Sequence, residues 1–141
     1  MSESEVARVE SALGFSLPAY YREFGIRYSD ELKSAEKALP LRTLLYTDPE
    51  EMIRDNEFSR RGDVFRLGEE QLPWPDNYLL VATNGGGDYW YVHRDGSDLG
   101  VWFWSHESCE TERVSASLSE YLDRLRADLR EPSRWQHDAW A

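Results

Sequence analysis

The span from position 88 to position 109 contains side chains of the types that serve acid–base, nucleophilic and metal chemistry, namely Asp88, His93, His106, Glu107 and Cys109. Their spacing matches no established arrangement for that chemistry. His106-Glu107 lacks the second histidine of an H-E-x-x-H zinc site, and Cys109, the one cysteine of the chain, can serve as a small apolar side chain. The pattern favours a domain without a catalytic, cofactor or metal site, and keeps a metal-assisted hydrolase as the weaker alternative.

Three consecutive glycines stand beside these side chains, in the segment Asn84-Gly85-Gly86-Gly87-Asp88. Backbone N–H groups in such a loop can bind an anion. The segment lacks G-x-G-x-x-G spacing and a following Lys-Ser/Thr pair, and Asp88 would repel phosphate. We therefore favour a tight connection between two strands that starts as an Asx-type turn.

The elements that must position these residues are three short runs of aromatic and β-branched residues, at 78–83, 89–93 and 101–104. Turn-forming residues separate the runs, which predicts an antiparallel three-stranded meander. Large aromatics alternate along it, and such side chains dominate the energetics of protein interfaces. The predicted partner-binding residues are these aromatics and the acidic and histidine residues beside them: Trp74, Asp76, Asp88, Tyr89, Tyr91, Trp102, Trp104, His106, Glu107 and Glu110. The alternative is that the aromatics are core residues and the acids are merely solvated.

The charge of the chain limits its partners. Sixteen Lys and Arg against 27 Asp and Glu give a net charge of −11 over 141 residues. A nucleic-acid ligand is disfavoured, because phosphate binding needs a basic surface, whereas an acidic surface speeds association with a basic protein. No apolar run is long enough for a membrane span, and no leader pattern stands at the N-terminus, so we expect a cytoplasmic protein.

Helices are predicted on both sides of the meander. Ser2 and Glu5 have capping-box spacing and Gly14 is placed to end a first helix. A second helix starts at Leu17-Pro18, and the two form a hairpin. Ser117 and Glu120 form another capping box, for a last helix that ends near Arg130.

The middle of the chain is less clearly patterned. Residues 29–39 extend the second helix or form a loop, and residues 41–46 are typical of a strand. Thr47 with Glu50, and Pro49 between them, predict a third helix whose few apolar residues place it at the edge of the domain. Residues 64–67 fit a short strand or a loop, and residues 105–113 a polar acidic loop. The result is one α+β domain over residues 1–130, a curved antiparallel sheet flanked by helices, with a tail at 131–141.

Four pieces in this order resemble the SMI1/KNR4 (SUKH) superfamily. They are the LGFSLPAYYREF segment at 13–24, the strand end at 84–88, the segment GVWFWSHE at 100–107 and the SLSEYL helix start at 117–122. The resemblance covers about Val6 to Leu129 and implies a curved antiparallel sheet flanked by helices. It also implies a protein-binding role, because many bacterial members are immunity proteins against toxins, often nucleases, and fungal members regulate cell-wall synthesis. We therefore predict a non-enzymatic immunity protein that binds a basic toxin, with a regulatory domain for a housekeeping partner as the alternative.

Overall fold

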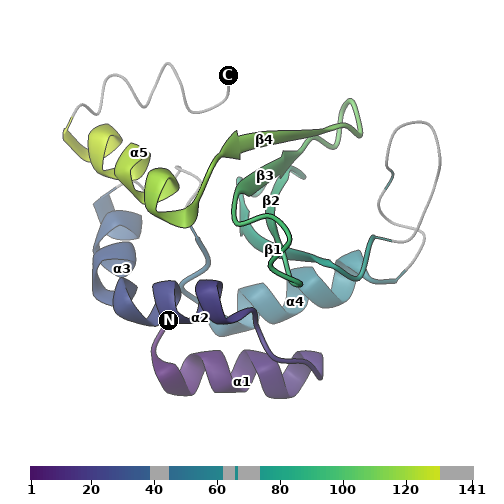
Figure 1. Cartoon of the computed structure of the whole chain (residues 1–141), viewed down its shortest axis with the longest axis horizontal. Helices are drawn as coiled ribbons and strands as arrows, with labels where there is room; N and C mark the ends of the chain where they lie inside the picture. The colour runs from purple at the N-terminus through teal and green to yellow at the C-terminus, as the bar shows by residue number, and fades with distance from the viewer. Residues whose placement is uncertain (39–44, 62–65, 67–73, 131–141) are drawn as a thin grey trace.

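The computed structural model describes residues 1–38, 45–61, 66 and 74–130 (Figure 1). Nine helices and strands lie within these residues, in the order α1 (Glu3–Leu13), α2 (Ala19–Arg27), α3 (Ser29–Ala38), α4 (Pro49–Ser59), β1 (Tyr78–Thr83), β2 (Tyr89–His93), β3 (Val101–Trp104), β4 (Thr111–Ser115) and α5 (Leu118–Arg130). The α+β class and the flanking helices at both ends are as predicted. The tail predicted at 131–141 lies outside the described residues.

The first helix begins and ends where the sequence predicts, and the second begins directly after Pro18 as predicted. The Oγ atom of Ser2 accepts a hydrogen bond from the Glu5 N–H, and the Glu5 carboxylate accepts one from the Ser2 N–H at 2.8 Å. This bond from the Ser2 backbone is the main reason that the pKa of Glu5 is lowered to about 2. Gly14 ends α1 in the left-handed region at φ 79°. The open question at 29–39 is answered by α3, a separate helix that starts directly after Tyr28.

The sheet has four strands rather than three, in the order β1-β2-β3-β4, and every neighbouring pair is antiparallel. The fourth strand, β4, begins within the stretch predicted as a polar acidic loop at 105–113, so that prediction is wrong for residues 111–113. Its first three residues are exposed polar side chains, because β4 is an edge strand, and they show no apolar alternation. Irregular register between Leu80 and Ala82 and between Val101 and Trp102 marks where the strands depart from flat pairing.

Helix α4 is covered on two sides, contrary to its predicted position at the edge of the domain. It packs against α1 on one side and β1 on the other, as Figure 1 shows. Its buried residues are Met52, Ile53, Asp55, Asn56 and Ser59, of which three are polar, and this is why its apolar stripe looked narrow. Its N-cap is also Asp48 rather than the predicted Thr47, because the Asp48 carboxylate accepts the Glu50 N–H at 3.0 Å.

Asn56 connects α4 to the outer edge of β1. Its amide nitrogen donates to the carbonyls of Leu80 and Met52, both at 2.9 Å. Its amide oxygen accepts the Leu80 N–H and an Arg60 guanidinium N–H, both at 3.0 Å. The side chain is 0% exposed, and all four of its hydrogen-bonding positions are used. Asn56 thus pairs with β1 as a neighbouring strand would.

Other groups complete the cover of the β1 edge. The Tyr78 carbonyl accepts from Arg60 Nη2 and from Trp74 Nε1, both at 3.1 Å. Leu45 forms an antiparallel bridge with Ala82, and the Tyr46 N–H donates to the Val81 carbonyl at 2.8 Å. The strand predicted at 41–46 is described only at these last two residues, since residues 41–44 lie outside the described part of the chain. The short strand or loop predicted at 64–67 is described only at Arg66.

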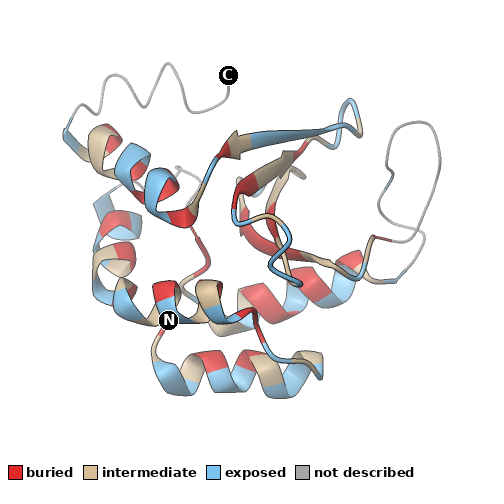
Figure 2. Cartoon of the chain, viewed as in Figure 1, coloured by how far each residue is buried: buried red, intermediate tan, exposed pale blue. Residues whose placement is uncertain are grey.

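The last helix, α5, starts as predicted. Ser117 Oγ accepts the Glu120 N–H at 3.1 Å, and the Glu120 carboxylate accepts the Ala116 N–H at 3.0 Å. Helix α5 packs against β4 and against α3. Figure 2 shows the buried residues on the inner sides of the helices and along the sheet. Among the described helices, no helix has the length and apolar character needed to cross a membrane.

Replacement of Asn56 by alanine tests the role of this side chain. We expect Asn56→Ala to lower the free energy of unfolding by about 3 kcal/mol, because the buried N–H and C=O of Leu80 lose their partners. Urea unfolding monitored by tryptophan fluorescence measures the change. Glu57→Ala, at an exposed position of the same helix, is the control and should change it by less than about 0.5 kcal/mol. Equal effects of the two variants would contradict the role given to Asn56.

Candidate protein-binding site

Two of the hairpin connections meet at one end of the sheet. The connection between β1 and β2 and the one between β3 and β4 lie together because consecutive strands run antiparallel. Asp88 joins them. One carboxylate oxygen accepts the His106 backbone N–H at 2.9 Å and lies 2.6 Å from His106 Nδ1, and the other accepts from the Asn84 side chain at 2.9 Å. We call this arrangement of Asn84, Asp88 and His106 the loop clasp.

The glycine connection is a tight turn, as predicted. The Asn84 carboxamide oxygen accepts the Gly86 N–H at 2.8 Å, which is the expected Asx-type start, and the Asp88 N–H at 3.3 Å. Thr83 Oγ1 accepts the Gly85 N–H at 3.1 Å. These N–H groups are therefore bonded within the loop, which removes the donors that an anion site would need.

Gly87 lets the two connections approach each other. Its φ is +106°, and a β-carbon at this position would lie 3.1 Å from the His106 ring. Both the backbone conformation and the contact favour glycine. The histidine ring is therefore packed against the loop as well as hydrogen-bonded to Asp88.

The ionisation of Asp88 favours the clasp. Burial acts to raise the pKa of this carboxyl group, but the hydrogen bonds from His106 and Asn84 outweigh it, so that the pKa lies below its ordinary value. A lowered pKa in the folded state means that the ionised carboxylate stabilises the fold above about pH 4. That contribution is lost as the pH falls through the folded-state pKa.

The predicted site residues divide into two groups. Asp88, Tyr89, His106, Glu107 and Glu110 lie at the clasp end, and the last three are exposed. Asp76 lies at the opposite end of the sheet, where its carboxylate is 3.2 Å from Arg94 Nη1. The sequence-predicted set is therefore not one patch.

Three of the predicted aromatics are core residues. Trp74 is 3% exposed, Tyr91 0% and Trp104 4%. The Trp74 ring meets Tyr91 and Trp104 edge-on, with centroids 5.4 and 5.8 Å apart. Trp102 is half-buried, and its indole N–H donates to Asp98 at 3.1 Å. Burial removes Trp74, Tyr91 and Trp104 from direct contact with a partner in this conformation and leaves Tyr89 and Trp102 as the accessible aromatics of the set.

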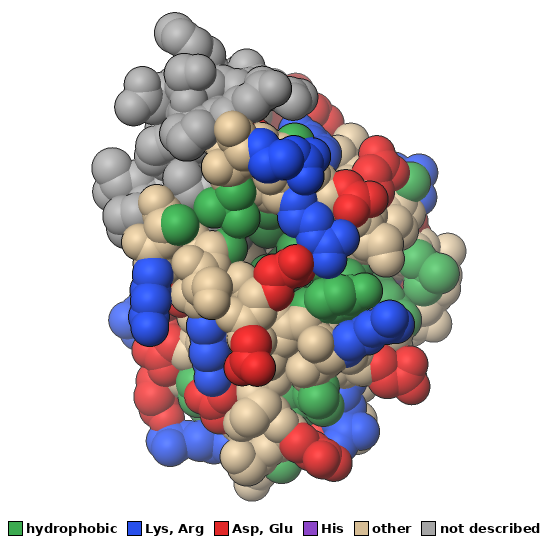
Figure 3. All heavy atoms as spheres, turned by 90° about the vertical axis from the view of Figure 1, so that its left-hand side faces the viewer, with side chains coloured by type: hydrophobic (Ala, Val, Ile, Leu, Met, Phe, Trp, Pro, Cys, Tyr) green, Lys and Arg blue, Asp and Glu red, His purple; other side chains and the backbone are tan. Residues whose placement is uncertain are grey.

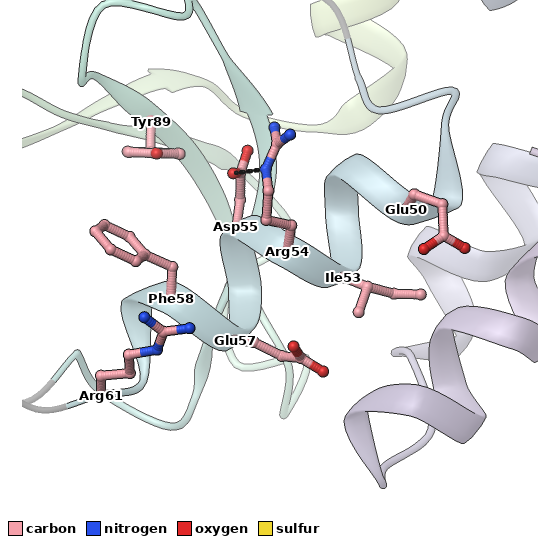
Figure 4. A pocket seen from close by; sticks show the side chains of 8 residues that line it. All are labelled: Glu50, Ile53, Arg54, Asp55, Glu57, Phe58, Arg61 and Tyr89. Atoms are coloured by element: carbon pink, nitrogen blue, oxygen red, sulfur yellow. Dashed lines mark hydrogen bonds and ion pairs between the residues drawn. The ribbon is translucent and has the colours of Figure 1, made fainter.

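The structure adds a surface hollow that sequence reasoning missed. It encloses about 400 Å³ beside α4, and Figure 4 shows its eight lining residues: Glu50, Ile53, Arg54, Asp55, Glu57, Phe58, Arg61 and Tyr89. Phe58 is 38% exposed, and Arg61 lies over its ring at 5.5 Å. Tyr89 directly follows Asp88, so the hollow adjoins the loop clasp. The sequence signal that could have indicated this hollow was Phe58, one of the few apolar residues of the predicted third helix.

Asp55 fixes the inner wall of the hollow. It is 7% exposed and accepts a hydrogen bond from the Tyr46 hydroxyl at 2.5 Å, while Arg54 Nε lies 3.3 Å from its other oxygen. Burial, and then the Asp55 carboxylate, raise the pKa of Tyr46. The tyrosine therefore stays protonated and keeps donating to Asp55 at physiological pH.

Of the five side chains considered for catalysis, His93 lies apart from the other four, which are at the clasp end. His93 lies at the far end of β2 from the clasp, where its carbonyl accepts from the Tyr20 hydroxyl at 2.8 Å. Cys109 points its sulfur toward the His106 carbonyl at 3.7 Å and has a left-handed backbone, with φ 57°. No group of three or more His, Cys, Asp or Glu side chains that could hold a metal ion occurs within the described ranges.

Substitution at Gly87 separates the ring contact from backbone strain. We expect Gly87→Ala to lower the free energy of unfolding by about 2 kcal/mol, because it adds both left-handed strain and the clash with His106. Gly85→Ala is the matched control, since Gly85 also has positive φ (+76°) but no heavy atom within 4 Å of its added β-carbon. Thermal unfolding of both variants measures the difference. If Gly85→Ala costs as much as Gly87→Ala, the packing of His106 on Gly87 contributes nothing.

The pH dependence of an Asp88→Asn variant tests the clasp electrostatically. Above about pH 4 we expect the wild-type chain to be more stable than the variant, because only the carboxylate offers the ionised acceptor. Below that pH the difference should shrink as Asp88 takes up a proton. Urea unfolding at several pH values between about 2.5 and 6 measures both proteins. A stability difference that stays constant to the lowest pH would show that the charge of Asp88 is not what stabilises the clasp.

Comparison with known proteins identifies one family. The family model described as SMI1 / KNR4 family (SUKH-1) matches residues 1–124, which is most of the chain. No curated protein and no solved structure matches.

Proposed function

We propose that this chain, which belongs to the SMI1/KNR4 family (SUKH-1), is a non-enzymatic cytoplasmic immunity protein that neutralises a basic, nuclease-type toxin by binding it directly. The single observation that carries the proposal is the loop clasp, with the exposed Glu107 and Glu110 on one of its two connections. It places two acidic side chains on a loop that is held in one conformation.

Preorganisation is the first argument for a binding role. Ordering a loop on binding costs free energy, and a loop that is already hydrogen-bonded avoids much of that cost. In the connection between β3 and β4, the Ser105 hydroxyl accepts the Glu107 N–H at 3.3 Å, and the Cys109 N–H donates to the Ser105 carbonyl at 2.8 Å. Together with the clasp, these bonds hold the segment that carries the two glutamates.

Charge complementarity is the second argument. A nuclease binds phosphate through Lys and Arg side chains and so presents a basic surface. A chain with a net charge of −11 and exposed glutamates beside the clasp is complementary to such a surface and would be steered toward it. On the face that carries α3 and α5, acidic and basic side chains are interspersed, as Figure 3 shows. Arg126 of that face pairs with Glu31 at 3.0 Å.

The adjoining hollow, whose lining also includes charged residues such as Arg54 and Arg61, supplies the aromatic contact that an acidic rim lacks. Tyr89 and Phe58 line it, and aromatic side chains in such recesses contribute much of the energy of protein interfaces. The proposed interface therefore runs from the exposed glutamates across the clasp to the hollow on α4.

Charge reversal tests this interface. We expect Glu107→Lys/Glu110→Lys to weaken binding to the toxin domain encoded beside the gene by about tenfold or more, because two favourable charge pairs become repulsive. The matched control reverses two exposed acidic residues of helices α2 and α3, Glu23→Lys and Asp30→Lys, and so changes the net charge by the same amount as the test variant. Isothermal titration calorimetry measures the affinity at two salt concentrations.

The outcomes separate the interface from the function. Equal losses in the two double variants would mean that only overall charge matters and that the clasp end is not the interface. No binding of the wild-type chain to that toxin domain, together with no protection of cells that express it, would overturn the immunity function itself.

A further inference from the structure

The outer edge of β4 has backbone groups that face away from the sheet. The Ser105 N–H donates to the Glu110 carbonyl at 3.1 Å and the Ser105 carbonyl accepts the Cys109 N–H at 2.8 Å, so the bonded position at the start of the β3–β4 ladder has Ser105 opposite Cys109 and Glu110. Hydrogen-bonded and non-bonded pairs alternate along an antiparallel ladder. The register pairs Phe103 with Glu112, which makes Glu112 an inward-bonded residue. The N–H and C=O groups of Thr111 and Arg113 therefore point outward.

The two edges of the sheet differ in how these outward groups are treated. At β1, the outward groups of Leu80 bond to Asn56, and the carbonyls of Tyr78 and Val81 have partners from outside the strand. At β4, Arg124 Nη1 donates to the Val114 carbonyl at 2.7 Å, near the end of the strand. In the part of the chain that the structure describes, no strand pairs with β4 on its outer side.

The side chains beside this edge have a definite character. Glu110 directly precedes β4 and is two positions from Glu112, so the two side chains lie on the same face, and Glu112 lies opposite Phe103. Phe103 is half-buried and packs on Trp90 with ring centroids 4.6 Å apart. The basic residue of the strand, Arg113, lies on the other face and is paired with Asp98 at 3.2 Å. The sheet face next to the outward backbone groups of Thr111 and Arg113 is therefore acidic, and the aromatic pair of Phe103 and Trp90 lies beside the two glutamates on that face.

We infer that the β4 edge takes an extended basic segment of the partner as a fifth strand. The partner's backbone would bond to the outward groups of Thr111 and Arg113, and its Lys or Arg side chains would lie over Glu110 and Glu112. This inference rests on the proposed function, because it gives that function a binding mode, and it places Glu110 in the interface through the strand as well as the loop.

A second copy of this chain fits the edge poorly. Two copies could pair their β4 edges antiparallel about a two-fold axis. If the axis passes through Glu112, that residue lies opposite its own copy. If it passes through Thr111, Glu110 of one copy lies opposite Glu112 of the other. Like charges directly opposite each other destabilise a sheet. A basic segment turns the same glutamates into favourable partners.

Amide hydrogen exchange of the full chain tests the edge without the toxin. In the free chain, the amides of Thr111 and Arg113 should exchange fast and that of Glu112 slowly. Addition of the synthetic peptide Lys-Val-Lys-Val-Lys-Val-Lys at millimolar concentration should slow Thr111 and Arg113 about tenfold, and the same peptide with glutamate in place of lysine should not. Protection of both amides already in the free chain, by a second copy or by another part of the chain, would overturn the inference. So would unchanged exchange with the basic peptide.

A proline substitution tests the edge with the toxin domain. Thr111→Pro removes an outward N–H without breaking the ladder to β3, and we expect it to weaken toxin binding about tenfold relative to Thr111→Val. Both variants lack the threonine hydroxyl, so the N–H is the group that distinguishes them. Circular dichroism verifies that both fold, and Glu112→Pro, which breaks an inward bond, should unfold more easily than either.

The two proposals can fail separately. Equal toxin binding by Thr111→Pro and Thr111→Val, with tight binding by the wild-type chain, overturns the edge and leaves the immunity function standing. Protection by the basic peptide without any toxin binding by the wild-type chain overturns the function and leaves the edge as a binding site for basic segments.

Discussion

The hydrogen bonds between Asn56 and the backbone of Leu80 are the interaction on which the arrangement of the domain depends. They fix α4 against β1, and α4 in turn lies between the sheet and α1. A buried amide is costly unless every donor and acceptor is used, and here the remaining positions bond to Met52 and Arg60. Because the geometry of these bonds is strict, they specify where the helix sits more sharply than apolar packing alone could.

This interaction also makes the sheet asymmetric. An edge strand with free N–H and C=O groups is a site for pairing with other chains. At β1 a helix side chain occupies the groups that another strand would use, whereas β4 begins with the three exposed residues Thr111, Glu112 and Arg113 and has no strand on its outer side among the described residues. The closed edge belongs to the core of the domain, and the open edge lies beside the loop clasp. The open edge is therefore the one remote from Asn56, whereas the hollow on α4 lies on the same helix as Asn56.

Local signals predicted the elements that are stabilised locally. The capping boxes at Ser2 and Ser117 and the ending at Gly14 depend on neighbours in the sequence, and they place α1 and α5 correctly. Strand β4 escaped such reasoning, and helix α4 was predicted but placed at the edge of the domain, because the packing of both depends on partners distant in sequence. Asn56 bonds to a residue 24 positions away, and nothing in its own helix distinguishes it from a solvated asparagine.

The same distinction decides how much of the site was predictable. The types of Trp74 and Trp104 fit an interface or a core equally well, and only the folded chain shows that their rings pack together and are buried. Asp88 and His106 were each named from the sequence, both among the residue types that could serve chemistry and among the predicted partner-binding residues, but the contact between them was not predicted. In the structure both oxygens of the Asp88 carboxylate are hydrogen-bonded, one to the backbone and ring of His106 and the other to Asn84. A carboxylate with both oxygens bonded to its own loops holds those loops together, and this contact cannot be read from the sequence of either loop alone.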